Sequence, residues 1–261
     1  MKIQVLFRKD IDTEEEFNIA NKFFPVKESR MADLNDSLII PRYSALPFYK
    51  ELEDDLSYVY SKLINSYKQH KYIADFQYYY DIIDLTPETY FQLHEVPEGG
   101  PYIVKGATNS RKFEWNTMMF AQDRKRAIEI ACDLRKDSMI QQQDIIVRKY
   151  IPLIKIEEGI NGLPMSNEWR FFCYDDTILS YGFYWSIAEE YGKLDYRAID
   201  LVKKVIKRVR GNIVFYVVDV AQKEDGEWIV IEMNDGSMSG LSANDPNTLY
   251  GNLYIQMIHR G

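Results

Sequence analysis

The chain has 261 residues, of which 46% are hydrophobic and 28% charged, a composition typical of a globular protein rather than a disordered or fibrous one. Its formal net charge of −8 argues against a general nucleic-acid scaffold, because binding to a phosphate backbone requires a basic face. The 2 cysteines and 3 histidines stand far apart in the sequence, so neither a disulfide framework, nor a zinc site, nor a histidine-based catalytic triad is indicated.

Nothing in the sequence suggests a membrane protein. No apolar run approaches the length of about 18 residues that a membrane span requires. The first apolar stretch is short and is followed at once by charged residues, unlike a signal peptide. We therefore expect a soluble, cytoplasmic protein without a membrane or nucleic-acid partner.

The first third of the chain has the pattern of a small α/β unit. We expect a strand at residues 3–7, a helix at 13–24, a second strand at 37–41, and a helix that begins near Pro47 and runs through Lys68. Proline and glycine then cluster between residues 85 and 101, which favours a domain boundary there. The predicted domains are residues 1–85 and residues 86–261.

The second domain is expected to mix helices with antiparallel hairpins, so that its fold class is α+β. The expected helices cover residues 122–136 and 196–209 and a last segment that begins near Asn244-Asp245-Pro246. The expected strands cover residues 102–104, 113–120, 145–151, 169–174, 178–184, 213–220 and 228–233.

A lysine at a strand end is the first candidate for chemistry. Lys105 closes the strand at 102–104 and is followed by a loop of small and polar residues, 106–112. The backbone N–H groups of such a loop can approach anionic oxygens, while the lysine adds a point charge from a rigid position. An alternative is that Lys105 is only a solvated charge before a turn.

Three oxygen-bearing side chains near the C-terminus form the second candidate. Asp219 interrupts an apolar strand, and Glu232 and Asn234 lie two residues apart on the next strand, so the latter two share a face. Carboxylate and amide oxygens from neighbouring strand ends are suitable ligands for Mg²⁺. The alternative is a hairpin stabilised by a salt bridge.

The third candidate combines a hydrophobic strand with a charged one. The strand at 145–151 leads into a proline-bearing segment whose backbone groups could contact a flat heterocycle. Glu168 and Arg170 share a face of the strand that follows. A cross-strand ion pair on a solvated sheet face is the alternative for these two residues.

In this order and spacing, the three segments resemble the ATP-grasp superfamily over roughly residues 86–261. The resemblance implies an ATP-grasp fold of two α+β lobes that grip ATP, about 86–146 and 147–261, after a small α/β domain. It implies that Lys105 contacts the phosphates and that Glu168 accepts a ribose hydroxyl. The adenine would lie against a hinge formed by Val147, Arg148, Lys149, Tyr150 and Ile151, and Mg²⁺ would bind Asp219, Glu232 and Asn234.

Within that superfamily the chain resembles a clade marked by two arginines and a lysine, related to the eukaryotic translation-factor assembly proteins of ATP-grasp fold. The residues that carry this resemblance are Lys105, Arg148 and Arg170, supported by the IIPRYSALPFYKELE segment. Arg148 stands where other ATP-grasp hinges usually have a glutamate. A guanidinium matches phosphate and carboxylate alike, so Arg170 and Arg148 are, with Lys105, the candidate catalytic residues. Arg42 is a candidate for a further cation from across the cleft, and the alternative is that it is a surface arginine.

The resemblance implies an ATP- and Mg²⁺-dependent carboxylate–amine ligase that forms an amide or peptide bond through an acylphosphate. Its partners would be ATP, a carboxylate substrate and an amine acceptor, which could include a peptide or protein. An alternative is a non-catalytic assembly factor or chaperone that binds ATP and Mg²⁺ and holds a partner protein. Two further alternatives are a nucleotide-independent binding domain and an enzyme that transfers phosphate to an alcohol.

Overall fold

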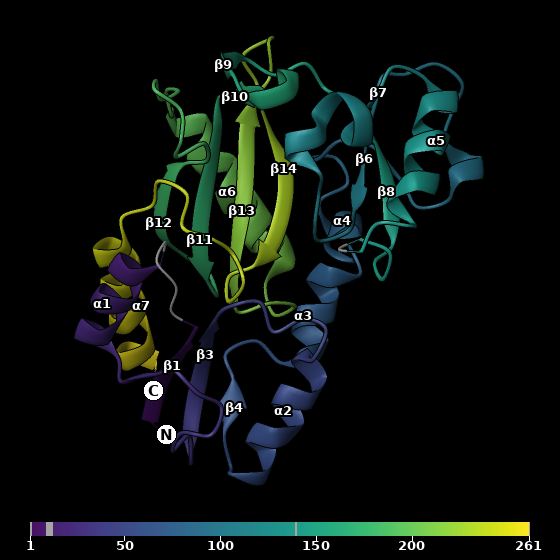
Figure 1. Cartoon of the computed structure of the whole chain (residues 1–261). Coiled ribbons are helices and arrows are strands. Elements are labelled where there is room, and N and C mark those ends of the chain that lie inside the picture. Colours follow the sequence, from purple (N-terminus) through teal and green to yellow (C-terminus); the bar gives the residue numbers. More distant parts are fainter. Residues whose placement is uncertain (1, 9–12, 139, 261) are drawn as a thin grey trace.

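The computed structural model describes residues 2–8, 13–138 and 140–260. Figure 1 shows a lower unit, which contains the first strands and the last helix, beneath two upper lobes. Among the helices of the described residues, none is both long enough and apolar enough to cross a membrane.

A parallel sheet in the order β2-β1-β3-β4 forms the centre of the N-terminal unit. Its strands are β1 (Lys2–Phe7), β2 (Val26–Lys27), β3 (Ser37–Arg42) and β4 (Lys62–Leu63), and its helices are α1 (Glu14–Phe23) and α2 (Tyr49–Tyr58). The inner strands β1 and β3 are largely buried, as expected where both faces of a parallel sheet are covered. The last helix, α7 (Pro246–Arg260), lies against α1, so the two ends of the chain meet in this unit.

The single helix expected from Pro47 through Lys68 is wrong. The chain leaves the helix after α2, forms β4 and begins a second helix, α3 (Tyr67–Ala74), which is followed by α4 (Tyr78–Asp81). Tyr60 has a positive φ of 58°, which no helix accommodates. Ser66 then starts α3 with a capping box, in which its side chain and that of Gln69 bond each other's backbone N–H groups. The spacing of the apolar residues is compatible with one long helix, because Leu63 falls on the same helical face as Leu52 and Leu56. In the structure Leu63 is instead buried in the sheet.

The first upper lobe is an antiparallel sheet in the order β5-β8-β6-β7, covered by α5 (Arg124–Leu134). Its strands are β5 (Thr89–Tyr90), β6 (Tyr102–Gly106), β7 (Phe120–Ala121) and β8 (Ile145–Lys149). The strand expected at 113–120 is wrong, because Lys112–Glu114 forms a 3₁₀ turn and Trp115–Met119 a π-helical turn.

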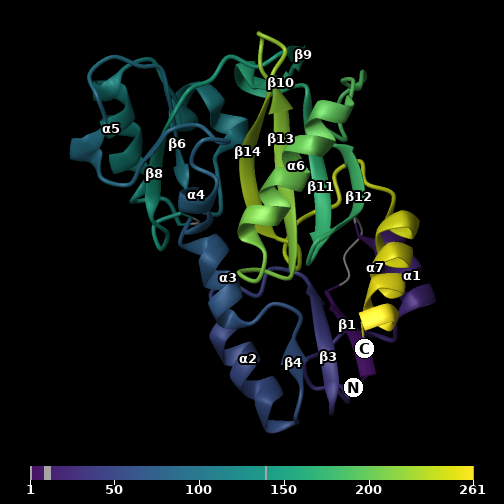
Figure 2. The same cartoon turned by 180° about the vertical axis from the view of Figure 1, so that it is seen from behind.

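The second upper lobe is an antiparallel sheet in the order β12-β11-β13-β14. Its strands are β11 (Glu168–Tyr174), β12 (Thr177–Phe183), β13 (Phe215–Gln222) and β14 (Trp228–Asp235), and a short hairpin of β9 (Lys155–Glu158) and β10 (Pro164–Ser166) lies above them. Helix α6 (Tyr196–Val209) covers one face, as Figure 2 shows. The opposite face packs on the N-terminal unit and α7 at its lower end and meets the first lobe above.

Asn65 connects the N-terminal unit to this sheet. It has no exposed surface, and its side-chain nitrogen donates to the carbonyl of Phe215 (2.6 Å) and to Asp235 (2.9 Å). Its side-chain oxygen accepts from the backbone N–H groups of Val214 (3.2 Å) and Phe215 (2.9 Å). One amide side chain therefore holds the start of β13 and the end of β14 against the N-terminal unit.

We expect Asn65→Ala to lower the free energy of unfolding by about 2–4 kcal/mol, because it leaves several buried backbone and carboxylate groups without partners. Urea denaturation followed by circular dichroism measures this loss. Asn212→Ala, which removes an exposed asparagine whose hydrogen bond to Asp81 is long (3.3 Å), is the matched control and should change stability little. Equal effects of the two substitutions would show that Asn65 does not clamp the units together.

Candidate functional site

The register of the second-lobe sheet brings the predicted charged residues together on its cleft face. Alternate residues of β13 pack under α6, whereas Asp219 points to the other side. Arg170 pairs with Asp219 on one side, and Glu232 pairs with Asp219 on the other. Asn234 lies two residues beyond Glu232 on the same face, and its side-chain nitrogen donates to Glu232 (3.1 Å).

Arg170 and Asp219 form a bidentate ion pair. The Nε and Nη2 atoms of Arg170 each donate to one oxygen of Asp219 at 2.8 Å, and Asp219 has no exposed surface. Arg170 also donates to the carbonyl of Gly240 (2.9 Å), and its guanidinium lies 4.8 Å from the ring centroid of Tyr184. The solvated pair of Glu168 and Arg170, considered as an alternative from the sequence, is therefore wrong.

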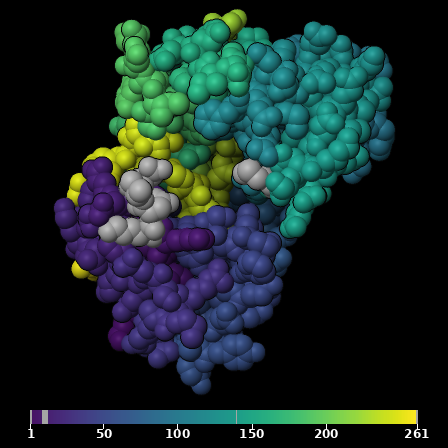
Figure 3. Space-filling model, in the orientation of Figure 1, coloured from purple at the N-terminus to yellow at the C-terminus, as the bar shows by residue number. Residues whose placement is uncertain are grey.

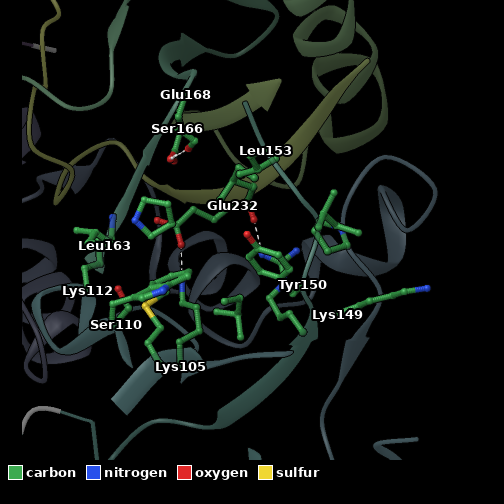
Figure 4. Close-up of a pocket in the computed structure, with 18 of the residues that line it drawn as sticks. Lys105, Ser110, Lys112, Lys149, Tyr150, Leu153, Leu163, Ser166, Glu168 and Glu232 are labelled. Atoms are coloured by element: carbon green, nitrogen blue, oxygen red, sulfur yellow. Dashed lines mark hydrogen bonds and ion pairs between the residues drawn. The ribbon is translucent and has the colours of Figure 1, made fainter. Parts of the chain in front are cut away.

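Lys105 projects from the end of β6 across the cleft and forms an ion pair with Glu232 (Figure 4). Both side chains are largely buried. Burial alone would raise the pKa of Glu232, but Lys105, Lys112 and Arg170 hold that pKa well below its usual range. Glu232 is therefore ionised and connects the two lobes electrostatically.

The hinge borders a cavity of about 140 Å³ between the lobes. Its apolar wall comes from both lobes and consists of Ile103, Trp115, Met119, Ile151, Leu153, Leu163 and Ile231. Trp115 and Met119, at the two ends of the π-helical turn at 115–119, both face this cavity. Along the hinge, Val147 is instead buried in the first-lobe core.

The rest of the hinge offers mainly backbone to the cavity. In Figure 4 the Lys149 side chain extends away from Lys105 and Glu232. The N–H of Lys149 bonds the carbonyl of Glu88 (2.8 Å), and that of Tyr150 bonds the carbonyl of Pro101 (3.0 Å). The N–H of Ile151, by contrast, has no hydrogen-bond partner among the described residues, so it is open to a ligand.

Arg148 lines this cavity, and each of its three guanidinium nitrogens already donates to a neutral group. Its guanidinium donates to the hydroxyls of Thr86 (2.7 Å) and Thr89 (3.0 Å) and to the carbonyl of Ile231. No described carboxylate forms an ion pair with it, and burial lowers the pKa of Arg148. These contacts tie the hinge strand to β14, which favours a positioning role, while the predicted contact of Arg148 with phosphate or carboxylate stays a prediction.

Glu168, which is buried, and Lys112, which is partly exposed, both line the hinge side of the site. Burial raises the pKa of Glu168 to about 8; Asp219 and Glu232 contribute to the increase, whereas Lys112 and Arg170 oppose it. Lys112 donates to the hydroxyl of Tyr184 and lies 4.1 Å from that ring's centroid. The sequence indicated only the loop at 106–112 and not Lys112 itself; the signal was a cation at the end of a small-residue loop.

A second cavity, of about 340 Å³, adjoins the first across Lys105, Ser110, Lys112 and Glu232, which line both. Its other walls include Ser44, Leu46 and His70 from the N-terminal unit, Arg170 and Asn234 from the second lobe, and Met238, Ser239 and Gly240 after β14. The sequence reasoning did not single out His70, whose Nδ1 lies 3.3 Å from Asp235. We call the first the hinge cavity and the second the substrate-side cavity.

Arg42 does not supply a cation to either cavity. It is buried, and it pairs with Glu16 through Nε (2.8 Å) and Nη2 (2.7 Å) and donates to the carbonyl of Gly236. The expectation of a further cation from across the cleft is therefore wrong, and so is the alternative of a surface arginine. Arg42 instead fixes the backbone that follows β14.

Residues 93–253 match the model of a protein family described as ATP-grasp domain, R2K clade family 3. The search of curated proteins found no match.

Several solved structures share the fold. D-cycloserine synthetase DcsG is 13% identical with a TM-score of 0.64, over 98% of this chain and 99% of that one. ATP-grasp ligase PsnB complexed with minimal precursor, Mg and ADP is 11% identical with a TM-score of 0.56, over 98% of each chain. D-alanine–D-alanine ligase from Bacillus anthracis complexed with ATP is 15% identical with a TM-score of 0.55, over 100% of this chain and 96% of that one. The family match and these likenesses confirm the predicted ATP-grasp fold.

The raised pKa of Glu168 makes stability depend on pH. Between its ordinary value of 4.5 and about 8, the folded protein keeps a proton that the unfolded chain releases, so the free energy of unfolding falls as pH rises through this range. We expect Glu168→Gln, which is neutral at every pH, to gain on the order of 3 kcal/mol relative to wild type from pH 5 to pH 8. Urea denaturation of both proteins at the two pH values measures the difference, and a difference independent of pH would contradict the assignment.

Proposed function

The chain belongs to the ATP-grasp family described as R2K clade family 3, and on this premise we propose that it is an ATP- and Mg²⁺-dependent carboxylate–amine ligase. One observation carries the proposal: an apolar cavity beside a hinge continues, across Lys105 and Glu232, into a polar cavity beside Arg170 and Asn234. The first suits a nucleotide base, and the second suits the reacting groups.

ATP would lie across both lobes. Its adenine would fit between the apolar walls of the hinge cavity, with the free N–H of Ile151 as a hydrogen-bond donor. Lys105 and Lys112 face the boundary between the two cavities, where the phosphates would lie. Glu168 lines the hinge cavity and is our candidate for the group that binds a ribose hydroxyl.

The residues present fit a Mg²⁺ ion. Asp219 and Glu232 are directly opposed on neighbouring strands, and the Asn234 side chain contacts Glu232, so that the three side chains together offer hard oxygen donors. No cluster of three or more histidine, cysteine or acidic residues suited to a metal occurs among the described residues, so the amide of Asn234 is needed to complete the set. Each Asp219 oxygen that accepts from Arg170 retains a further lone pair. Mg²⁺ would supply positive charge that neutralises the phosphate oxygens.

The proposed reaction proceeds in two displacements. A substrate carboxylate oxygen attacks the γ-phosphorus and ADP leaves, which yields an acylphosphate; an amine then attacks the acyl carbon, loses a proton and expels phosphate. This chemistry depends mainly on alignment and charge neutralisation. Arg170 lines the substrate-side cavity with its guanidinium held by Asp219 and Gly240, so it is fixed in place to bind the carboxylate or the transferring phosphate.

The finer assignments are also proposals. We propose that the substrate includes a peptide or protein, which gains support from the likeness to PsnB, an ATP-grasp ligase whose solved structures contain precursor peptides. The relation to the eukaryotic translation-factor assembly proteins rests on Lys105, Arg148 and Arg170 and stays a prediction.

Calorimetric titration of ATP with Mg²⁺ tests the nucleotide site. We expect Lys105→Met to weaken ATP binding by about ten- to a hundredfold, because it removes a charge-assisted contact to phosphate.

Glu232→Gln should instead raise the Mg²⁺ concentration for half-saturation in the same titration roughly tenfold, since it removes one charged ligand. Lys136→Met, at an exposed lysine near the end of α5, is the control. Unchanged ATP affinity in Lys105→Met would show that the phosphates bind elsewhere.

The reaction itself is tested by ADP release with hydroxylamine as the amine and a panel of free amino acids and acidic peptides as carboxylates. We expect ADP and a hydroxamate to form together, and only when a carboxylate is present. Release of ADP without a hydroxamate would favour phosphate transfer to another acceptor. Stoichiometric ATP binding without ADP release would contradict the ligase and favour the non-catalytic assembly factor.

A further inference from the structure

A third cavity, of about 460 Å³, lies at the carboxyl ends of β1 and β3 in the N-terminal unit. Its walls include Leu6, Phe7 and Arg8 from the end of β1 and Tyr43, Ser44, Ala45 and Leu46 after β3. We call it the β1/β3 crevice. In the sheet order β2-β1-β3-β4, β2 is added on one side of β1, and β3 and β4 are added on its other side. The direction in which strands are added therefore reverses between β1 and β3. Open α/β sheets bind ligands in the crevice at this point of reversal.

The crevice adjoins the site described above. Ser44 and Leu46 line both the β1/β3 crevice and the substrate-side cavity. The substrate-side cavity in turn shares Lys105 and Glu232 with the hinge cavity. Figure 3 shows this face hollowed between the N-terminal unit and the first lobe. A molecule whose reactive group lies beside Arg170 can therefore extend past Ser44 into the crevice.

The chemistry of the crevice favours an occupant that is both anionic and apolar. Among the described residues, its charged lining consists of Arg8, Arg30 and Glu28. The Arg30 side chain donates to the hydroxyl of Tyr43 (2.9 Å) and lies 5.5 Å from that ring's centroid, whereas Arg8 has no ion-pair partner among the described residues. The chain as a whole carries a charge of −8, so a local excess of positive charge would draw an acidic ligand here rather than elsewhere on the surface.

Exposed apolar side chains stand next to these arginines. Leu46 is 37% exposed and Phe48 is 56% exposed, and both line the crevice. Apolar groups of this size gain free energy when a ligand covers them. The crevice thus pairs guanidinium groups with an apolar patch, a combination that matches a peptide with acidic and aliphatic side chains.

Resting on the proposed function, we propose that the β1/β3 crevice is a recognition subsite for the carboxylate substrate and that this substrate is an acidic, partly apolar peptide segment rather than a free amino acid. The carboxylate that reacts would lie in the substrate-side cavity by Arg170. A further carboxylate of the same chain would contact Arg8 and Arg30, and an aliphatic side chain would cover Leu46 and Phe48. A free amino acid could occupy only one of the two cavities.

Fluorescence anisotropy with a labelled short peptide of alternating glutamate and leucine tests this subsite. The peptide is titrated with the full-length protein, both alone and saturated with the Mg²⁺ complex of AMPPNP. We expect Arg8→Ala/Arg30→Ala to weaken binding about tenfold, while Leu46→Ser/Phe48→Ser weakens it by a similar factor. Arg135→Ala/Lys136→Ala, which removes two exposed cations at the far end of α5, should leave the affinity unchanged. A peptide of alternating lysine and leucine should not bind.

Each other outcome overturns the proposal in a recognisable way. Binding that survives Arg8→Ala/Arg30→Ala, or that is equal for the lysine peptide, would show that the crevice does not select an acidic chain. Failure of the acidic peptide to bind a protein that still binds the nucleotide complex would exclude this substrate class and leave the ATP-dependent activity standing. Failure to bind nucleotide would contradict the proposed function. The peptide titration without nucleotide would then test independently whether the crevice binds an acidic peptide.

Discussion

The bidentate ion pair between Arg170 and Asp219 is the interaction around which the rest of the site is built. A carboxylate with no exposed surface in an apolar strand is stable only with a cation or several donors around it. The antiparallel register meets this need, because it places Arg170 opposite Asp219 on one side and Glu232 on the other. A slip of one residue would turn these side chains towards α6, so the register that satisfies the core also assembles the site.

The charged side chains between the two lobes hold the lobes together and make the cleft suitable for an anionic ligand. Lys105, Lys112 and Arg170 meet Glu168, Asp219 and Glu232 between the lobes. Burial raises the pKa of Glu168 to about 8 and lowers the pKa of Lys112, while Lys105 pairs with Glu232 and Arg170 with Asp219. Such a cluster is suited to the phosphates of a nucleotide. Arg148 adds a further cation whose contacts are all to neutral groups, and it fixes the hinge strand on β14.

The errors of sequence interpretation have identifiable physical causes. The helix expected through Lys68 failed because Leu63 fits an apolar helical face and a buried strand equally well, and only the neighbouring β3 selects the strand. The strand expected at 113–120 failed because contacts with a distant segment decide its conformation. The Asn116 side chain donates to the backbone carbonyl of Asn161, and the Asn161 side chain donates to the backbone carbonyl of Phe113. These two bonds hold residues 113–116 in a turn. Arg42 was assigned to the cleft because its actual partner, Glu16, lies 26 residues away on a helix, and the sequence does not show that the two residues meet.

The sequence by itself determined which local patterns carry the chemistry: a lysine at a strand end, a polar interruption of an apolar strand, and an acidic residue two positions from an asparagine. Periodicity and residue type are local properties, and they suffice for most of the long strands, for the α+β class and for the family resemblance. Only the tertiary structure decided that Asp219 pairs with Arg170, that Lys112 and Glu168 line the same cavity, and that the last helix returns to the first. These contacts join residues far apart in the chain, and they form only when whole elements pack, because burial and strand register are properties of the assembled fold.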